Sequence, residues 1–197
     1  MAAHRTVTAR VAVLAAVTAL TGGVLLGPGS AAADADLHRP QTNGPCAYTS
    51  TPDRPAARPV PLPPDPRYTP DSGWVRVELR TNHGNLTLML DRAKAPCTVQ
   101  SFVHLTTHRF YDETFCHRLT AYATLKVLQC GDPSGTGSGG PGYSYGDELP
   151  TDLPSAPTDP TGQRRIYPRA TLAMANAGSD TNGSQFFLVY VTGRSVW

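Results

Sequence analysis

The stretch Trp74-Val-Arg-Val-Glu-Leu-Arg80 alternates apolar and polar residues, and Asn85-Leu-Thr-Leu-Met-Leu90 alternates again. A period of two is typical of strands that are buried on one face. Asn82-His-Gly84 lies between the two stretches and has the composition of a turn, so the sequence predicts a β-hairpin. The hairpin marks the start of a compact domain, because the chain before it has a different composition.

A helix is expected after the hairpin, from about Ala95, with Pro96 near its first position. One face of this helix collects Val99, Phe102, Val103 and Thr106 at helical spacing. Further apolar runs predict strands at Phe115–Leu119, Lys126–Cys130, Ala170–Ala175 and Gln185–Tyr190. Many strands with one or two helices indicate a mainly β domain, either a β-barrel or an α+β fold.

Residues 1–33 have the pattern of a secretory signal peptide. Arg5 and Arg10 precede an apolar stretch, and Ala31-Ala32-Ala33 precedes Asp34. The alternative is an uncleaved membrane anchor, but the apolar stretch is short and interrupted by glycine. Without a twin arginine or a cysteine at its end, the segment predicts Sec-type export to a secreted or extracytoplasmic location, with no stable membrane insertion.

Residues 34–73 hold ten of the 19 prolines in the chain. Proline fixes the backbone and removes a hydrogen-bond donor, so neither a helix nor a central strand is expected. The sequence predicts an extended linker of polyproline type, with Cys46 and Tyr48 as candidates for pinning part of it to the domain. The alternative is a ligand for a partner domain with an aromatic groove.

The small net charge of the chain argues against nucleic acid as a partner. The net charge of the 197-residue chain is +2, which is too small to indicate a nucleic-acid binder. Cleavage after Ala33 removes two of the 17 basic residues and none of the 15 acidic ones, so the rest of the chain is neutral.

The four cysteines are Cys46, Cys97, Cys116 and Cys130. In an exported chain they permit two disulfides, with three possible connectivities. A zinc site is disfavoured because no Cys-x-x-Cys spacing occurs. A nucleophilic Cys116 beside His117 is disfavoured because neighbouring side chains on a strand point to opposite faces.

The run Gly135-Thr-Gly-Ser-Gly-Gly140 satisfies the spacing of a dinucleotide-binding loop. That motif must open a helix, and Pro141-Gly142 follows here instead. We therefore expect a structural loop and no nucleotide.

Several motifs follow one another from Val75 onward: Thr81-Asn-His-Gly84-Asn-Leu, Ala95-Pro96-Cys-Thr98-Val-Gln-Ser-Phe102, Phe110-Tyr111-Asp, Phe115-Cys-His117-Arg118, Gln129-Cys-Gly131-Asp132-Pro, Gly135-Thr-Gly137-Ser-Gly-Gly-Pro141-Gly-Tyr143, Leu172-Ala-Met174-Ala175-Asn176-Ala-Gly178 and Asn182-Gly183-Ser184-Gln185-Phe186-Phe187. In this order they resemble cyclophilin-type peptidyl-prolyl cis-trans isomerases over about 120 residues. The export signal, the proline-rich stretch and the Cys-His-Arg variant resemble secreted actinobacterial members.

This resemblance implies a cyclophilin-like antiparallel β-barrel of eight strands with flanking helices. The chain stops at Trp197, before the last strands of the family pattern, so we expect the domain over residues 74–197 to be incomplete at its C-terminus. Trp197 could replace the tryptophan of the family's pocket.

The resemblance also implies site residues. Arg118 matches the catalytic arginine, which can donate to a prolyl nitrogen as the X–Pro bond rotates. The positions that match the substrate groove are His117, Gln129, Ala175, Asn176, Gln185 and Phe187, with Phe187 at the proline pocket. The segment from Arg118 to Gln129 is longer than the family norm, and Leu125 or Tyr122 could replace missing pocket residues.

The implied function is isomerisation of X–Pro bonds during protein folding outside the cytoplasm. No bond is broken, so we expect no metal and no cofactor. The expected partners are proline-containing peptides and unfolded proteins, and the expected state is a monomer. The alternative is a binding module for prolyl peptides without catalysis, or an inactive truncated fragment.

Overall fold

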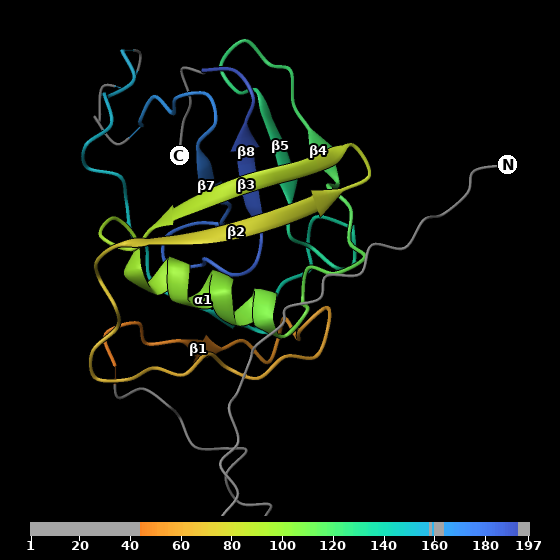
Figure 1. Ribbon diagram of the computed structural model, residues 1–197, viewed down its shortest axis with the longest axis vertical. Helices are drawn as coiled ribbons and strands as arrows, with labels where there is room; N and C mark the ends of the chain where they lie inside the picture. Colours follow the sequence, from red (N-terminus) through yellow and green to blue (C-terminus); the bar gives the residue numbers. More distant parts are fainter. Residues whose placement is uncertain (1–43, 158, 160–163, 193–197) are drawn as a thin grey trace, which may run out of the picture.

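The computed structural model describes residues 44–157, 159 and 164–192 (Figure 1). The predicted signal peptide and Trp197 lie outside the described residues. Strand β2 (Trp74–Thr81) pairs antiparallel with strand β3 (Gly84–Asp91), which confirms the predicted hairpin. The apolar positions of the two strands pair with one another, as Val77 with Leu88.

Helix α1 (Pro96–Thr107) follows the hairpin, with Ala95 as its N-cap. Proline fits the first turn because its missing N–H would have no partner there. The carboxylate of Glu148 accepts hydrogen bonds from the backbone N–H groups of Cys97 and Thr98, at 2.9 and 2.8 Å. Glu148 thereby satisfies two free donors of the helix and places negative charge at the positive end of its dipole.

The main apolar cluster lies between α1 and the strands. Val99 and Phe102, from the predicted helix face, are buried together with Leu88 and Leu90 of β3, and Val103 packs at the edge. Each fully buried aliphatic or aromatic side chain of this kind contributes about 1.5–3 kcal/mol. The predicted helix face is therefore the face that joins helix and hairpin.

A second sheet lies behind the hairpin in the view of Figure 1. Its strands pair antiparallel in the order β4 (Arg118–Leu119), β5 (Val127–Cys130), β8 (Phe186–Val189) and β7 (Leu172–Met174). All four predicted strands are found, each shorter than predicted. One face of this sheet contributes Cys130 and Phe186 to the main cluster, and the opposite face stays available for a site.

Residues 44–73, which we call the strap, cross the far side of α1. Strand β1 (Thr49–Ser50) of the strap pairs with strand β6 (Tyr143–Ser144). Figure 1 shows the strap, in orange and yellow, along the face of α1 away from the hairpin. Tyr48 of the strap and Leu105 of α1 are buried together in a second cluster between strap and domain.

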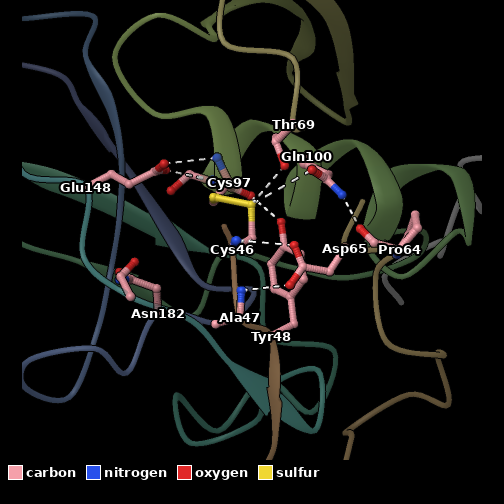
Figure 2. Close-up of a disulfide and its surroundings, with 12 residues drawn as sticks. Cys46, Ala47, Tyr48, Pro64, Asp65, Thr69, Cys97, Gln100, Glu148 and Asn182 are labelled. Carbon is pink, nitrogen blue, oxygen red and sulfur yellow. Dashed lines mark hydrogen bonds between the residues drawn. A yellow bond between two sulfur atoms is a disulfide. The ribbon is translucent and has the colours of Figure 1, made fainter. Parts of the chain in front are cut away.

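The strap is fixed by covalent and polar contacts (Figure 2). A disulfide joins Cys46 to Cys97 in the first turn of α1. The Tyr48 hydroxyl donates to the Cys97 carbonyl at 2.7 Å. The Asp65 carboxylate, itself buried, accepts from the backbone N–H groups of Cys46 and Ala47 at 3.2 and 2.8 Å.

The strap also holds the turn that follows α1. The Nη1 atom of Arg58 donates to the carbonyls of Arg109, Phe110 and Asp112, at 2.8, 2.9 and 2.6 Å. Residues 44–73 of the predicted linker therefore pack on the domain, through Cys46 and Tyr48 as expected and through Arg58 in addition. Proline content limits local conformation only, and it carries no information on these distant contacts.

The connectivity of the disulfides is now assigned. Cys116 pairs with Cys130 at the end of β5, in addition to the pair at the strap. None of the four cysteines is free, and all four lie within the described residues, so a thiolate zinc site and a cysteine nucleophile are excluded.

The fold class is mainly β with antiparallel strands and a flanking helix, as predicted. In the part of the chain that the structure describes, the strands pair as β1 with β6, as the hairpin of β2 and β3, and as the sheet of β4, β5, β8 and β7. Over the same residues, no helix has the length and apolar character needed to cross a bilayer.

Removing the strap disulfide tests how strongly the strap is held. In the variant Cys46→Ser/Cys97→Ser we expect the free energy of unfolding in urea to fall by about 4 kcal/mol, because the crosslink spans 51 residues and restricts the unfolded chain. The matched control Cys116→Ser/Cys130→Ser removes a crosslink over 14 residues and should lose about 3 kcal/mol. A loss below about 1 kcal/mol in the first variant would contradict the assigned role.

Candidate functional site

Three predicted site residues form a row across the second sheet. Arg118 of β4 lies opposite Gln129 of β5, and Gln129 lies opposite Phe187 of β8. Directly paired residues of antiparallel strands point to the same face. The row therefore lies on the face opposite the main cluster.

The long segment between Arg118 and Gln129 does not disturb this register. Thr120 closes the hairpin by donating its N–H to the Val127 carbonyl at 2.9 Å, and the additional residues form a loop beyond it. The sequence offered two residues as replacements for missing pocket residues. One of them, Leu125, packs against the cluster that contains Phe187. Tyr122, the other, is 63% exposed and joins no such cluster.

Hydrogen bonds continue the row toward the glycine-rich loop. Arg118 Nη1 donates to Gln129 Oε1 at 3.1 Å, and Gln129 Nε2 donates to Gln185 Oε1 at 2.8 Å. Gln185 Nε2 then donates to the carbonyls of Gly137 and Gly139, at 3.0 and 2.9 Å. The guanidinium thus keeps one side engaged with Gln129, and Arg118 itself is exposed to solvent.

The glycine-rich loop is organised by the carboxylate of Asp132, which is fully buried. It accepts hydrogen bonds from the Ser134 N–H and hydroxyl, at 2.8 and 2.7 Å. It also accepts from the N–H groups of Gly137 and Gly139, at 2.7 and 3.0 Å. Burial alone would raise the pKa of Asp132, but these hydrogen bonds outweigh burial and hold the pKa below its ordinary value.

Glycine is required at two positions here, for different reasons. A Cβ at Gly139 would lie 2.0 Å from Asp132 Oδ1, so there is no space for a side chain. Gly131 has a φ of +91°, a backbone conformation that favours glycine. After the loop the chain enters β6 and not a helix, so the exclusion of a dinucleotide site is consistent with the structure. The loop serves to place its carbonyls against Gln185.

The remaining predicted residues lie around the row. The Ala175 N–H donates to the Gln185 carbonyl at 2.9 Å, and Asn176 Nδ2 donates to Asp147 Oδ1 at 3.4 Å. Both residues line a hollow that also includes Gln129 and Gln185. His117 lies under the glycine loop, where a Cβ at Gly137 would be 3.3 Å from its ring.

Two residues of the site region were not predicted. Tyr167 packs edge-on against Phe187, with ring centroids 5.8 Å apart, and it is buried in the same cluster. Asp132 organises the loop, and its sequence signal is an aspartate two residues before a serine in a glycine-rich turn, where the side chain bonds the following backbone.

The arrangement offers donors without a nucleophile. A charged guanidinium and a glutamine amide stand beside an apolar cluster around Phe187. Within the described ranges, no three His, Cys, Asp or Glu side chains gather as metal ligands would. Such a site can donate hydrogen bonds to a ligand that lies on this face of the sheet.

These features define a mainly β protein with an exposed arginine beside an apolar cluster on one face of a sheet. Residues 76–195 match the family model for cyclophilin type peptidyl-prolyl cis-trans isomerases. The chain therefore belongs to the cyclophilin-type peptidyl-prolyl cis-trans isomerase family.

Individual relatives agree with this assignment. The chain is 52% identical over 145 residues to a probable peptidyl-prolyl cis-trans isomerase B of Mycobacterium tuberculosis, covering 74% of this chain and 47% of that protein. It is 51% identical over 146 residues to the protein of the same name from Mycobacterium leprae, covering 74% and 49%. The chain spans about half the length of these curated relatives.

A solved structure supports the fold. The crystal structure of a cyclophilin type peptidyl-prolyl cis-trans isomerase from Cryptosporidium parvum matches with a TM-score of 0.50 and 30% identity. The match covers 61% of this chain and 69% of that one.

Substitution Asp132→Asn tests the organisation of the loop. At pH 7 we expect a loss of about 1–3 kcal/mol in the free energy of unfolding, because the amide keeps one acceptor oxygen only and turns an NH2 donor toward the N–H groups that bonded the other. The pKa of Asp132 is lowered by folding, so its stabilisation is present above the unfolded pKa and is lost as pH falls through the folded value. The difference between the two proteins should shrink below about pH 4.

Denaturant titrations from pH 7 to pH 2.5 measure this difference. Asp71→Asn is the control, since Asp71 is exposed. A difference between wild type and Asp132→Asn that is independent of pH would show that the charge of Asp132 is not what holds the loop.

Proposed function

We propose that this chain accelerates cis-trans isomerisation of X–Pro bonds in peptides and unfolded proteins. The observation that carries the proposal is the row of Arg118, Gln129 and Phe187 on one sheet face. Family membership and the names of the mycobacterial relatives support the same activity.

Rotation about an X–Pro bond has a barrier of about 18–20 kcal/mol, which comes from amide resonance. In the twisted state the prolyl nitrogen regains its lone pair and can accept a hydrogen bond. The Arg118 guanidinium is permanently charged and offers donors in a rigid plane. Its bond to Gln129 occupies part of this donor set and orients the rest toward a bound peptide.

The apolar cluster around Phe187 would receive the proline ring. Phe187 packs with Val127 and Val189, and Leu125 and Ala175 lie at the edge. Stabilisation of the twisted state relative to the planar one raises the rate, by about tenfold for each 1.36 kcal/mol.

We also infer that the chain acts outside the cytoplasm. The signal-peptide pattern of residues 1–33 and the use of all four cysteines in disulfides support export. Protein recovered from outside the cell should begin after Ala33 or Ala35, and a protein retained in the cytoplasm with intact residues 1–33 would contradict this inference.

Substitution Arg118→Ala tests the proposed catalysis. We expect kcat/KM for a proline peptide to fall about 100-fold or more, the usual loss for a donor used in the transition state. The assay is NMR exchange between the cis and trans peptide, or cleavage by a protease specific for the trans form. The control is Arg76→Ala, which removes an exposed arginine paired with Glu78 on β2.

The alternative of a binding module predicts a different result. Peptide would bind to the wild-type chain without any acceleration of exchange, and Arg118→Ala would change affinity alone. Equal acceleration by wild type and Arg118→Ala would also contradict the proposed role of Arg118.

A further inference from the structure

A hollow of about 130 Å³ continues the candidate groove away from Phe187. It shares Gln129, Ala175, Asn176 and Gln185 with the predicted groove. These are positions that would hold the residues preceding a bound proline. Since a single water requires about 10–15 Å³ of such space, the hollow has room for a short side chain.

The strap supplies one wall of this hollow. Thr51 and Arg54 line it, together with the backbone of the glycine-rich loop. Both residues precede residues 76–195, the part of the chain that the family model matches. This wall therefore lies outside the part of the chain that the family model matches.

The backbone at Arg54 is fixed on both sides. Thr51 N–H donates to the Gly142 carbonyl at 2.8 Å, and Ala57 N–H donates to the Gly140 carbonyl at 2.8 Å. Between them, the Arg54 N–H donates to the Thr51 carbonyl at 2.9 Å, and the Thr51 hydroxyl donates to the Arg54 carbonyl at 3.0 Å. The guanidinium is thus carried by a tight turn bonded to the loop that forms the hollow.

Arg54 gives the hollow a positive charge. Among the described residues that line it, Arg54 is the one charged side chain, and no carboxylate of the described chain forms an ion pair with it. Asp147 lies nearby as the acceptor for Asn176. Its oxygens already accept from the Asn182 side chain at 2.7 Å and from the Asp180 N–H at 3.1 Å.

We propose that Arg54 is a specificity residue, which selects peptides with an acidic side chain two or three residues before the proline. This proposal rests on the proposed function, because it takes the row of Arg118, Gln129 and Phe187 as the place of the proline. An aspartate or glutamate in the hollow pairs with the Arg54 guanidinium. A lysine at the same position meets a like charge and binds less tightly.

Binding of three proline peptides to the full chain tests the proposal. The peptides carry Glu, Gln or Lys at the second position before the proline, and a second set carries them at the third. Calorimetry at low salt should give a Kd for the Glu peptide about two- to fivefold lower than for the Gln peptide in one of the two sets, the usual strength of an exposed ion pair. The preference should shrink in 0.5 M NaCl, where charges are screened.

Two variants with the same change of charge show whether Arg54 is the residue that sets the preference for acidic peptides. Arg54→Glu should reverse the order of the Glu and Lys peptides. Arg67→Glu changes another exposed arginine of the strap that does not line the hollow, and it should keep the wild-type order. The proposal is overturned if wild type shows no preference in either set, if both variants change it equally, or if no peptide binds.

Turnover of the Gln peptides separates this inference from the proposed function. A preference for Glu without acceleration of exchange would leave the role of Arg54 intact and contradict catalysis. Acceleration without any preference for Glu would contradict the role of Arg54 alone.

Discussion

The alternation of side chains along β8 is the constraint on which both core and site depend. Phe186 points into the main cluster against α1 and the hairpin, and Phe187 points to the opposite face. Pairing in register then sets Gln129 beside Phe187 and Arg118 beside Gln129. A shift of one residue would exchange the two faces, burying polar groups and exposing the core. The hydrophobic free energy that stabilises the fold therefore also fixes the site.

The strap extends this arrangement to a part of the chain that precedes the family's domain. It holds the first turn of α1 through the Cys46–Cys97 disulfide, and the turn that follows the helix through Arg58. It also bonds the glycine-rich loop, which Asp132 orders from within. Helix, loop and strap are thus connected, so the wall that carries Arg54 is built on the same supports as the row on the sheet.

Local patterns predicted what depends on local sequence. The alternation from Trp74 predicted the hairpin, and helical spacing of Val99 and Phe102 predicted the buried face of α1. The resemblance predicted that Arg118 and Gln129 act together, and the structure brings them into contact. Of the anchors of the strap, Cys46 and Tyr48 were expected from the sequence, but the partners of Asp65 and Arg58 were not, because proline content constrains only the backbone and these partners lie elsewhere in the chain. The pairing of four cysteines is likewise open from sequence alone.

The central claim is that the face of the second sheet with Arg118, Gln129 and Phe187 binds prolyl peptides. An NMR titration of the labelled chain with a proline peptide tests it most directly. The account predicts that the side-chain amides of Gln129 and Gln185 and the Arg118 guanidinium shift most, with little change along β2. Changes confined to the hairpin or the strap, with the signals of Gln129 and Gln185 unmoved, would contradict it.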